Sequence, residues 1–290
     1  MIFKNNNFIR LYIGLNILLF SFFVEGKEFD YKFHWLFVPV ANLSINIDES
    51  MATDSPINLL DIKFQLSTEG PLKLLRNYQS TVKRKFSQKD EWNYHLIGID
   101  RGKPEEKLIS YSSTNYPVVH TFIDDEGTEP LRDDELKDLR LIDPVSVLIN
   151  TIERLNESKA CSNEFLVFDG KRRYKVTVKH VGNEYLSADR SQAYSGPAVH
   201  CQMKLFGDKL FEKNKNTFLE EARDPTTGLP IGPTVDAKYR IFQNKQWPFN
   251  GEERVIDIWF SGKKKYMPVK FAIKTPIGRV IGRQLVTIEE

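Results

Sequence analysis

The sequence lacks the residue patterns that mark most enzymes. Its only cysteines are Cys161 and Cys201, and no Cys-x-x-Cys arrangement is present to activate a thiol for redox catalysis. No Gly-x-Ser-x-Gly nucleophile elbow and no glycine-rich phosphate loop occurs. Carboxylates are plentiful, but no spacing singles out one pair for glycoside hydrolysis. We therefore expect no catalytic residue, no cofactor and no enzymatic activity.

Metal-ligand spacings are also missing. None of the five histidines stands in a His-x-x-x-His pair or near a cysteine at zinc-ligand spacing, so we interpret all of them as structural. Residues 124–138 are acidic, but their spacing does not match a calcium loop and favours a solvated loop. We therefore expect no metal site. The histidines are His34, His95, His120, His180 and His200.

Net charge of either sign is nearly absent. The 41 basic and 39 acidic residues leave a formal charge of +2, which argues against a nucleic-acid partner. Two basic runs stand out, at 83–85 and 263–265. The first should lie on a strand with its charges on alternating faces. The run at 263–265 should be a solvated hairpin tip. The more specific alternative is that it contacts anionic lipid or another envelope polymer.

The first 26 residues have the layout of a secretory signal peptide. Lys4 and Arg10 precede an apolar run at 11–23, and Gly26 ends a plausible cleavage site. The run is shorter than the roughly 20 residues that span a bilayer, although an uncleaved anchor stays open. We expect a periplasmic protein that does not span the membrane, with a mature chain of 264 of the 290 residues.

In an exported chain, two cysteines most simply form one disulfide, here Cys161–Cys201. A pair of buried free thiols is the alternative. Closing a loop of about forty residues would stabilise the fold by roughly 4 kcal/mol in the chain-entropy description.

The segment between these cysteines gives the clearest structural signal. An apolar run at 165–168 meets Asp169-Gly170, which is typical of a tight hairpin turn. From Tyr174 onward apolar and polar residues alternate, as in a strand with one buried face. The same alternation returns from Val199 to Leu205. We therefore predict a three-stranded meander.

Strand-favouring residues continue through most of the chain, which has 20 Phe and 11 Tyr. One convincing helix should begin at Asp143, a good N-cap, with Pro144 in its first turn and an apolar face toward the sheet. A shorter helical turn should begin at Pro71. Further strands are predicted at 29–35, 38–47, 57–67, 78–86, 94–99, 108–112, 118–123, 254–260, 266–274 and 279–288.

These elements predict a single mainly-β domain over residues 27–290. Its centre should be one large, curved antiparallel sheet, a spiral or partial barrel, with the helix packed against it. Residues 206–251 are rich in turn residues and aromatics, and we expect them to form a long loop excursion.

The order of several motifs resembles the bacterial periplasmic family called domain of unknown function 3108, in its α-proteobacterial branch. The motifs are Phe29-Asp30-Tyr31, Glu69-Gly70-Pro71-Leu72, Asp143-Pro144-Val145-Ser146, Val167-Phe168-Asp169-Gly170-Lys171-Arg172-Arg173-Tyr174, Ser195-Gly196-Pro197-Ala198-Val199-His200-Cys201, Met267-Pro268-Val269-Lys270 and Thr275-Pro276-Ile277-Gly278. The resemblance implies a secreted, curved antiparallel β protein with a bridged cysteine pair. It implies no established activity and no catalytic residue.

Three functional hypotheses follow. The first is a non-enzymatic envelope protein that holds an acyl-chain ligand inside the curved sheet, which predicts an apolar pocket. The second is a scaffold that binds another envelope protein through loop 206–251. The third is a hydrolase with an unrecognised acid pair. Lipid and envelope protein are thus the expected partners, and the sequence predicts no oligomeric state.

Overall fold

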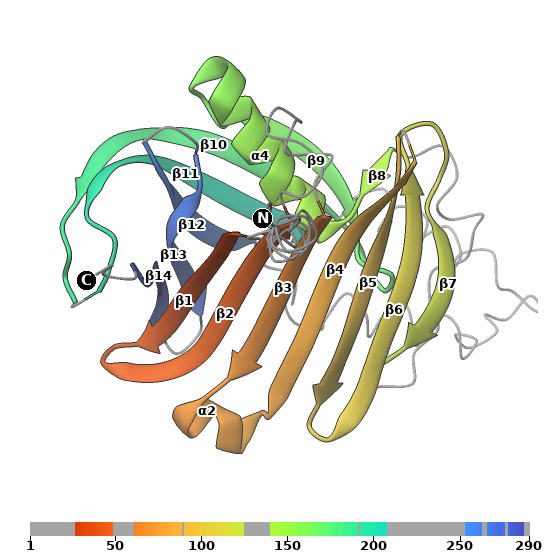
Figure 1. The fold of residues 1–290 in the computed structure, drawn as a ribbon, viewed down its shortest axis with the longest axis horizontal. Coiled ribbons are helices and arrows are strands. Elements are labelled where there is room, and N and C mark those ends of the chain that lie inside the picture. The colour runs from red at the N-terminus through yellow and green to blue at the C-terminus, as the bar shows by residue number, and fades with distance from the viewer. Residues whose placement is uncertain are drawn as a thin grey trace, which may run out of the picture.

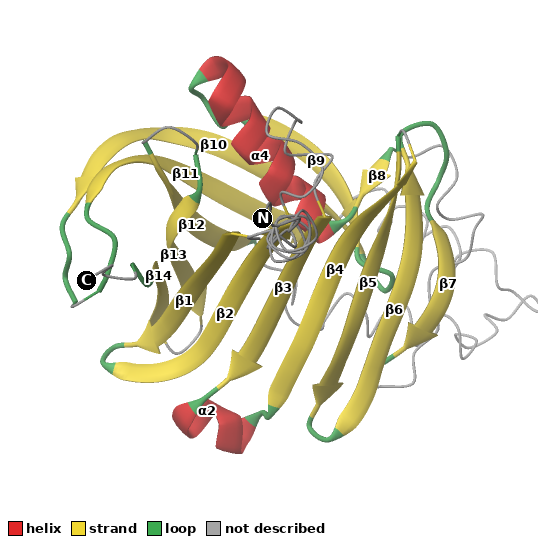
Figure 2. Cartoon of the chain, in the orientation of Figure 1, coloured by secondary structure: helices red, strands yellow, loops and turns green. Residues whose placement is uncertain are grey.

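The computed structural model describes residues 27–48, 61–88, 90–124, 140–190, 192–207, 253–262, 266–275 and 278–286. Within them, fourteen strands form one sheet, and the expectation of a mainly-β fold with one notable helix is confirmed (Figures 1 and 2). The strands are β1 (Lys27–Trp35), β2 (Val38–Asp48), β3 (Asp61–Thr68), β4 (Tyr78–Gln88), β5 (Glu91–Asp100), β6 (Lys103–Ser112), β7 (Val118–Ile123), β8 (Leu141–Ile142), β9 (Asn163–Phe168), β10 (Arg173–Leu186), β11 (Gly196–Gly207), β12 (Arg254–Ser261), β13 (Pro268–Thr275) and β14 (Gly278–Gln284). The helices are α2 (Gly70–Leu75) and α4 (Pro144–Ser158).

Strands that follow each other along the chain mostly lie side by side. The order across the sheet is β7-β6-β5-β4-β3-β2-β1-β14-β13-β12-β11-β10-β9-β8, and neighbours are antiparallel except for β8 and β9. The pairing of β1 with β14, which places Tyr31 opposite Gln284, joins the two halves. Figure 1 shows β1–β7 as one layer, with β9–β14 running across behind it.

The sheet rolls until regions far apart in its strand order meet. The hydroxyl of Tyr111 on β6 donates to the carbonyl of Phe168 at the end of β9, over 2.7 Å. Nearby, the buried ammonium of Lys171 lies 2.8 Å from a carboxylate oxygen of Asp124. A Cβ added at Gly170 would stand only 2.9 Å from Ile109, so the predicted Asp169-Gly170 turn packs directly on β6. These contacts close the roll.

Aromatic side chains occupy the space inside the roll. Tyr31, Tyr111, Phe168 and Phe260 are each at most 1% exposed. Burial raises the pKa of Tyr111, as it does for the neighbouring phenols of Tyr94 and Tyr174. Side chains of the sheet thus pack a dry interior, as expected for a close-packed core.

Helix α4 lies across one end of the roll (Figure 1), and contacts at its N-terminus attach it to the sheet. Asp143 caps the helix as the sequence predicts: its Oδ1 accepts from the backbone N–H of Val145 at 2.8 Å and of Ser146 at 3.0 Å. Its Oδ2 accepts from Trp92 Nε1 on β5 at 2.6 Å and lies 3.7 Å from Arg84 Nε on β4. One carboxylate therefore ties the helix to two strands.

Several expectations fall outside the described residues. These are the signal peptide at 1–26, the acidic stretch 124–138 except Asp124, the basic run 263–265, and loop 206–251 except its first two residues, which belong to β11. Among the residues that are described, no helix is both long enough and apolar enough to cross a membrane.

Candidate functional site

Five large apolar side chains project into solvent at one end of the molecule. Leu36 is 70% exposed, Phe37 86%, Leu74 91% and Leu75 81%, with Val38 beside them at 37%. We call these five residues the apolar tip. Exposed apolar patches of a few hundred Å² often mark interaction sites, and five exposed apolar side chains gathered on neighbouring turns make a patch of about this size.

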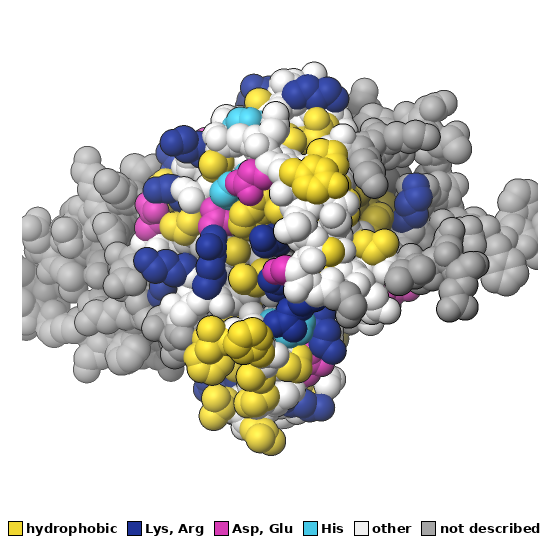
Figure 3. Space-filling view, turned by 90° about the vertical axis from the view of Figure 1, so that its left-hand side faces the viewer, with side chains coloured by type: hydrophobic (Ala, Val, Ile, Leu, Met, Phe, Trp, Pro, Cys, Tyr) yellow, Lys and Arg dark blue, Asp and Glu magenta, His cyan; other side chains and the backbone are white. Residues whose placement is uncertain are grey.

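The apolar tip is assembled from two turns that pack against each other. Leu36, at a positive φ of 54°, reverses the chain between β1 and β2. Helix α2 is held beside this hairpin because the backbone N–H of Glu69 donates to Val40 O at 2.9 Å. Gly70 lies so close to Pro39 that an added Cβ would be 2.5 Å from its carbonyl oxygen. Figure 3 shows the result as a hydrophobic surface at the lower end of the molecule, where Figure 1 places these turns.

Positive charge borders the apolar tip. Arg190 donates from its guanidinium to the carbonyl of Leu36 at 3.1 Å. Lys73 stands between the leucines of α2, and Lys32 lies 3.6 Å from Glu69. Among the described residues, neither Arg190 nor Lys73 has a carboxylate within ion-pair distance. The tip therefore combines apolar side chains with two cations that have no acidic partner in the described part of the chain.

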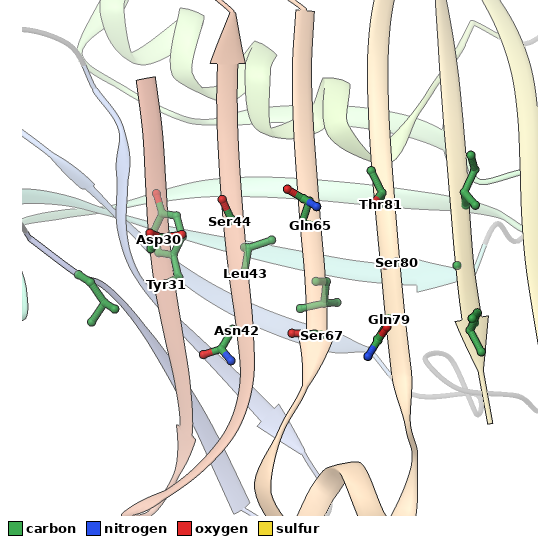
Figure 4. A pocket seen from close by; sticks show the side chains of 15 residues that line it. Asp30, Tyr31, Asn42, Leu43, Ser44, Gln65, Ser67, Gln79, Ser80 and Thr81 are labelled. Carbon is green, nitrogen blue, oxygen red and sulfur yellow. The ribbon is translucent and has the colours of Figure 1, made fainter. Parts of the chain in front are cut away.

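A second candidate is a pocket of about 650 Å³ over β1–β5. Tyr31 faces the core, so its chain neighbour Asp30 faces outward, and the register places Ser44, Gln65 and Thr81 in one row with it. Figure 4 shows these four side chains on successive strands. We call this outward-facing row, with the parallel row Asn42, Ser67 and Gln79, the polar trough.

The polar trough differs from the pocket that the acyl-chain hypothesis predicts. Its two rows carry amides, hydroxyls and one carboxylate, and the apolar residues that also line it are Tyr31, Leu43, Leu66, Ile97, Ile99 and Leu285. It also lies on the outer face of the sheet, away from the packed aromatic interior. Its two polar rows suit a ligand that forms hydrogen bonds.

A third candidate is a polar cluster around His200 on the outer face of β11. The two ring nitrogens lie 3.0 Å from carboxylate oxygens of Glu184 and Asp257. The ring stacks on Trp259 with centroids 4.4 Å apart, and Arg279 lies 2.8 Å from Asp257. Both nitrogens of the imidazole thus already have a carboxylate partner within the protein.

Acid should weaken this cluster. Burial by itself raises the pKa of Asp257, but hydrogen bonds from Gln202, His200 and Arg279 lower it overall. A carboxyl group whose pKa is lower in the folded than in the unfolded state stabilises the fold at pH values above its unfolded-state pKa. This stabilisation is lost as the pH falls through its folded-state pKa.

We therefore expect the stability difference between the parent and Asp257→Asn to be largest near neutral pH and to shrink below about pH 4. Urea unfolding at several pH values would measure it. The groups that face Asp257 are His200, Gln202 and Arg279, with Glu184 behind the imidazole. A difference that stays constant over this range would contradict the assignment.

The cysteines are the only site residues that the sequence predicts, and they lie together. Cys161 and Cys201 form a disulfide whose Cα atoms are 6.3 Å apart, and both are fully buried. The bridge joins the segment before β9 to β11. His180 lies alongside, with Nδ1 3.8 Å from the sulfur of Cys161, consistent with a structural histidine.

Sequence reasoning missed the apolar tip. Leu72, Leu74 and Leu75 were expected only as a helical turn, and Leu36-Phe37 only as the break between two strands. One signal could have found it: turns between strands are ordinarily polar or rich in glycine, whereas this one has two large apolar residues. Among the described residues, no cluster of three or more histidine, cysteine or acidic side chains has the arrangement of a metal site.

Comparison with known proteins supports the fold. No family model matches the sequence, and no curated protein matches it. Among solved structures, the chain is similar to a β-barrel-like protein of domain of unknown function 1849 from Brucella abortus. The TM-score is 0.50 at 10% sequence identity, and the alignment covers 91% of this chain and 96% of the other. The similarity shows a shared barrel-like β fold.

Proposed function

We propose that this chain is an exported, non-enzymatic protein of the bacterial cell envelope, related to domain of unknown function 3108, that acts by contact through the apolar tip. The single observation that carries the proposal is the exposure of Leu36, Phe37, Leu74 and Leu75 at 70–91% on two packed turns. Such a surface is unfavourable in water unless a partner covers it.

Two further observations support export and a non-catalytic role. The buried Cys161–Cys201 bridge is of the kind that persists in oxidising compartments such as the periplasm. The imidazole of His200 is held between two carboxylates and an indole ring, an arrangement that suits a structural histidine. The acyl-chain hypothesis has weaker support, because two rows of polar side chains line the polar trough. The scaffold hypothesis based on loop 206–251 concerns residues outside those described.

Native mass spectrometry of the protein, purified gently from its own periplasm without detergent, tests this proposal. We expect a chain that begins after Gly26 and weighs two hydrogens less than its reduced form. An unprocessed or fully reduced chain would contradict export. A dissociable adduct of lipid mass would instead favour the acyl-chain carrier, and turnover of an envelope substrate would favour the hydrolase.

A further inference from the structure

We infer that the apolar tip inserts into the interface of an anionic phospholipid membrane, with the neighbouring cations on the lipid headgroups. This inference rests on the proposed function and names the partner of the same surface. It is carried by three features: the shape of the tip, the cations that border it, and an arrangement of like charges beside it.

The shape favours a fluid partner. Phe37 at 86% and Leu74 at 91% exposure are almost free of protein contacts, so they project rather than line a groove. A rigid protein partner would need a matching pocket for each projecting side chain, because protein interfaces pack as tightly as interiors. Acyl chains rearrange around any apolar shape, and membrane-surface elements combine aliphatic and aromatic residues with Lys or Arg in this way.

The bordering cations are placed to meet anionic headgroups. Lys73 lies between Leu72 and Leu74, and the guanidinium of Arg190 is anchored on Leu36 O. Both lack an acidic partner among the residues described, so an external anion would be their first ionic contact. Basic residues next to an inserted apolar surface add attraction to anionic lipids and not to zwitterionic ones.

Like charges accumulate beside the tip. The sheet register places Lys270 opposite Arg283 and Arg283 opposite Lys32, although like charges in directly opposed positions are destabilising. Asp189 pairs with Arg283 and Glu69 with Lys32, which offsets this repulsion in part. Figure 3 shows Lys and Arg side chains next to the hydrophobic surface.

The positive field is also visible in a buried histidine. His34 is 9% exposed, and its Nδ1 has no hydrogen-bond partner. Its pKa is lowered first by burial and then by the charges of Arg190, Arg283 and Lys32. Burial is the larger cause, but the three cations that also lower this pKa attract anions, and a charged membrane surface presents many anions in one plane.

Flotation of the full purified chain with lipid vesicles tests the inference. We expect binding to vesicles of phosphatidylcholine mixed with phosphatidylglycerol and much weaker binding to phosphatidylcholine alone. The double variant Phe37→Ser/Leu74→Ser should bind the mixed vesicles on the order of tenfold more weakly or not at all, because the inserted apolar area is removed. Lys73→Glu should weaken binding to the mixed vesicles only.

Tyr185→Ser is the matched control, because Tyr185 is a large side chain on β10 that is 76% exposed and lies outside the tip. It should bind as the parent does. All variants should keep the parental melting temperature, since each removed side chain is exposed. Equal binding to both vesicle types, or binding that the double variant retains, would overturn the inference.

Failure of the inference can be separated from failure of the proposed function by native mass spectrometry of the parent and the double variant. One outcome is that the parent does not bind vesicles but forms a complex with an envelope protein or a second copy, and the double variant does not form this complex. This result would overturn the proposal that lipid is the partner, while the proposal that the tip acts by contact would stand. Absence of every tip-dependent association overturns both.

Discussion

Replacing Asp143 by alanine should lower the free energy of unfolding by about 3–5 kcal/mol, the range found when one partner of a buried ion pair is removed. The carboxylate is fully buried. It accepts from two backbone N–H groups of α4 and from Trp92 Nε1, and it lies beside Arg84. Alanine would leave all of these donors without an acceptor in a dry environment.

Arg84 makes this loss larger than that of an ordinary helix cap. Its side chain is buried, and burial lowers its pKa even though Asp143 opposes the shift. The guanidinium also donates to Ser146 Oγ, at 3.1 Å, and lies over the rings of Phe86 and Trp92, but none of these three groups carries a negative charge. Loss of a carboxylate beside a buried charge is more costly than loss of an acceptor for an uncharged amide.

Urea denaturation of the parent, Asp143→Ala and Asp143→Asn would measure the effect. The asparagine variant keeps an acceptor for the helix N-terminus but not the charge, so it should fall between the other two. Asp30→Ala, on the exposed outer face, is the control and should stay within about 0.5 kcal/mol of the parent. A loss below about 1 kcal/mol for the alanine variant would show that water or a rearrangement satisfies the donors.

Removal of the disulfide should have a comparable effect. Replacing Cys161 and Cys201 together by alanine opens a loop with a sequence separation of 40 residues. Chain entropy alone then predicts a loss of roughly 4 kcal/mol. Alanine is preferred to serine because both positions are fully buried and a hydroxyl there would lack a partner.

Unfolding of the oxidised parent, the reduced parent and the double variant in urea would measure this loss. The reduced parent and the double variant should agree closely, because both lack the same covalent constraint. A double variant as stable as the oxidised parent would mean that the neighbouring strands constrain this segment even in the unfolded ensemble.

The fold was predictable wherever the signal was local. Asp143-Pro144 marks the start of α4, and Asp169-Gly170 marks the β9–β10 turn, because capping and turn chemistry depend on residues a few positions apart. Alternation likewise predicts the strands, because the period of two follows from backbone geometry. The curved antiparallel sheet followed from the number of such strands.

The side-chain contacts between segments far apart in the sequence could not be predicted. Nothing in the local sequence of Asp143 indicates that Trp92 and Arg84 will reach it from β5 and β4, since each of these residues reads as part of its own strand. The same holds for His200 between Glu184 and Asp257, which depends on the register of β10, β11 and β12. To predict the apolar tip, one would have to know that the β1–β2 turn and helix α2 lie next to each other in the fold.

The position of β1 in the sheet has a consequence for how the chain reaches its folded state. Of the described strands, β1 is synthesised first and β14 last, yet they are direct partners, with Tyr31 opposite Gln284. Until β14 is complete, one edge of β1 keeps its N–H and C=O groups available to any other strand. Such a high contact order implies slow folding and a period of aggregation risk that only the last strand ends.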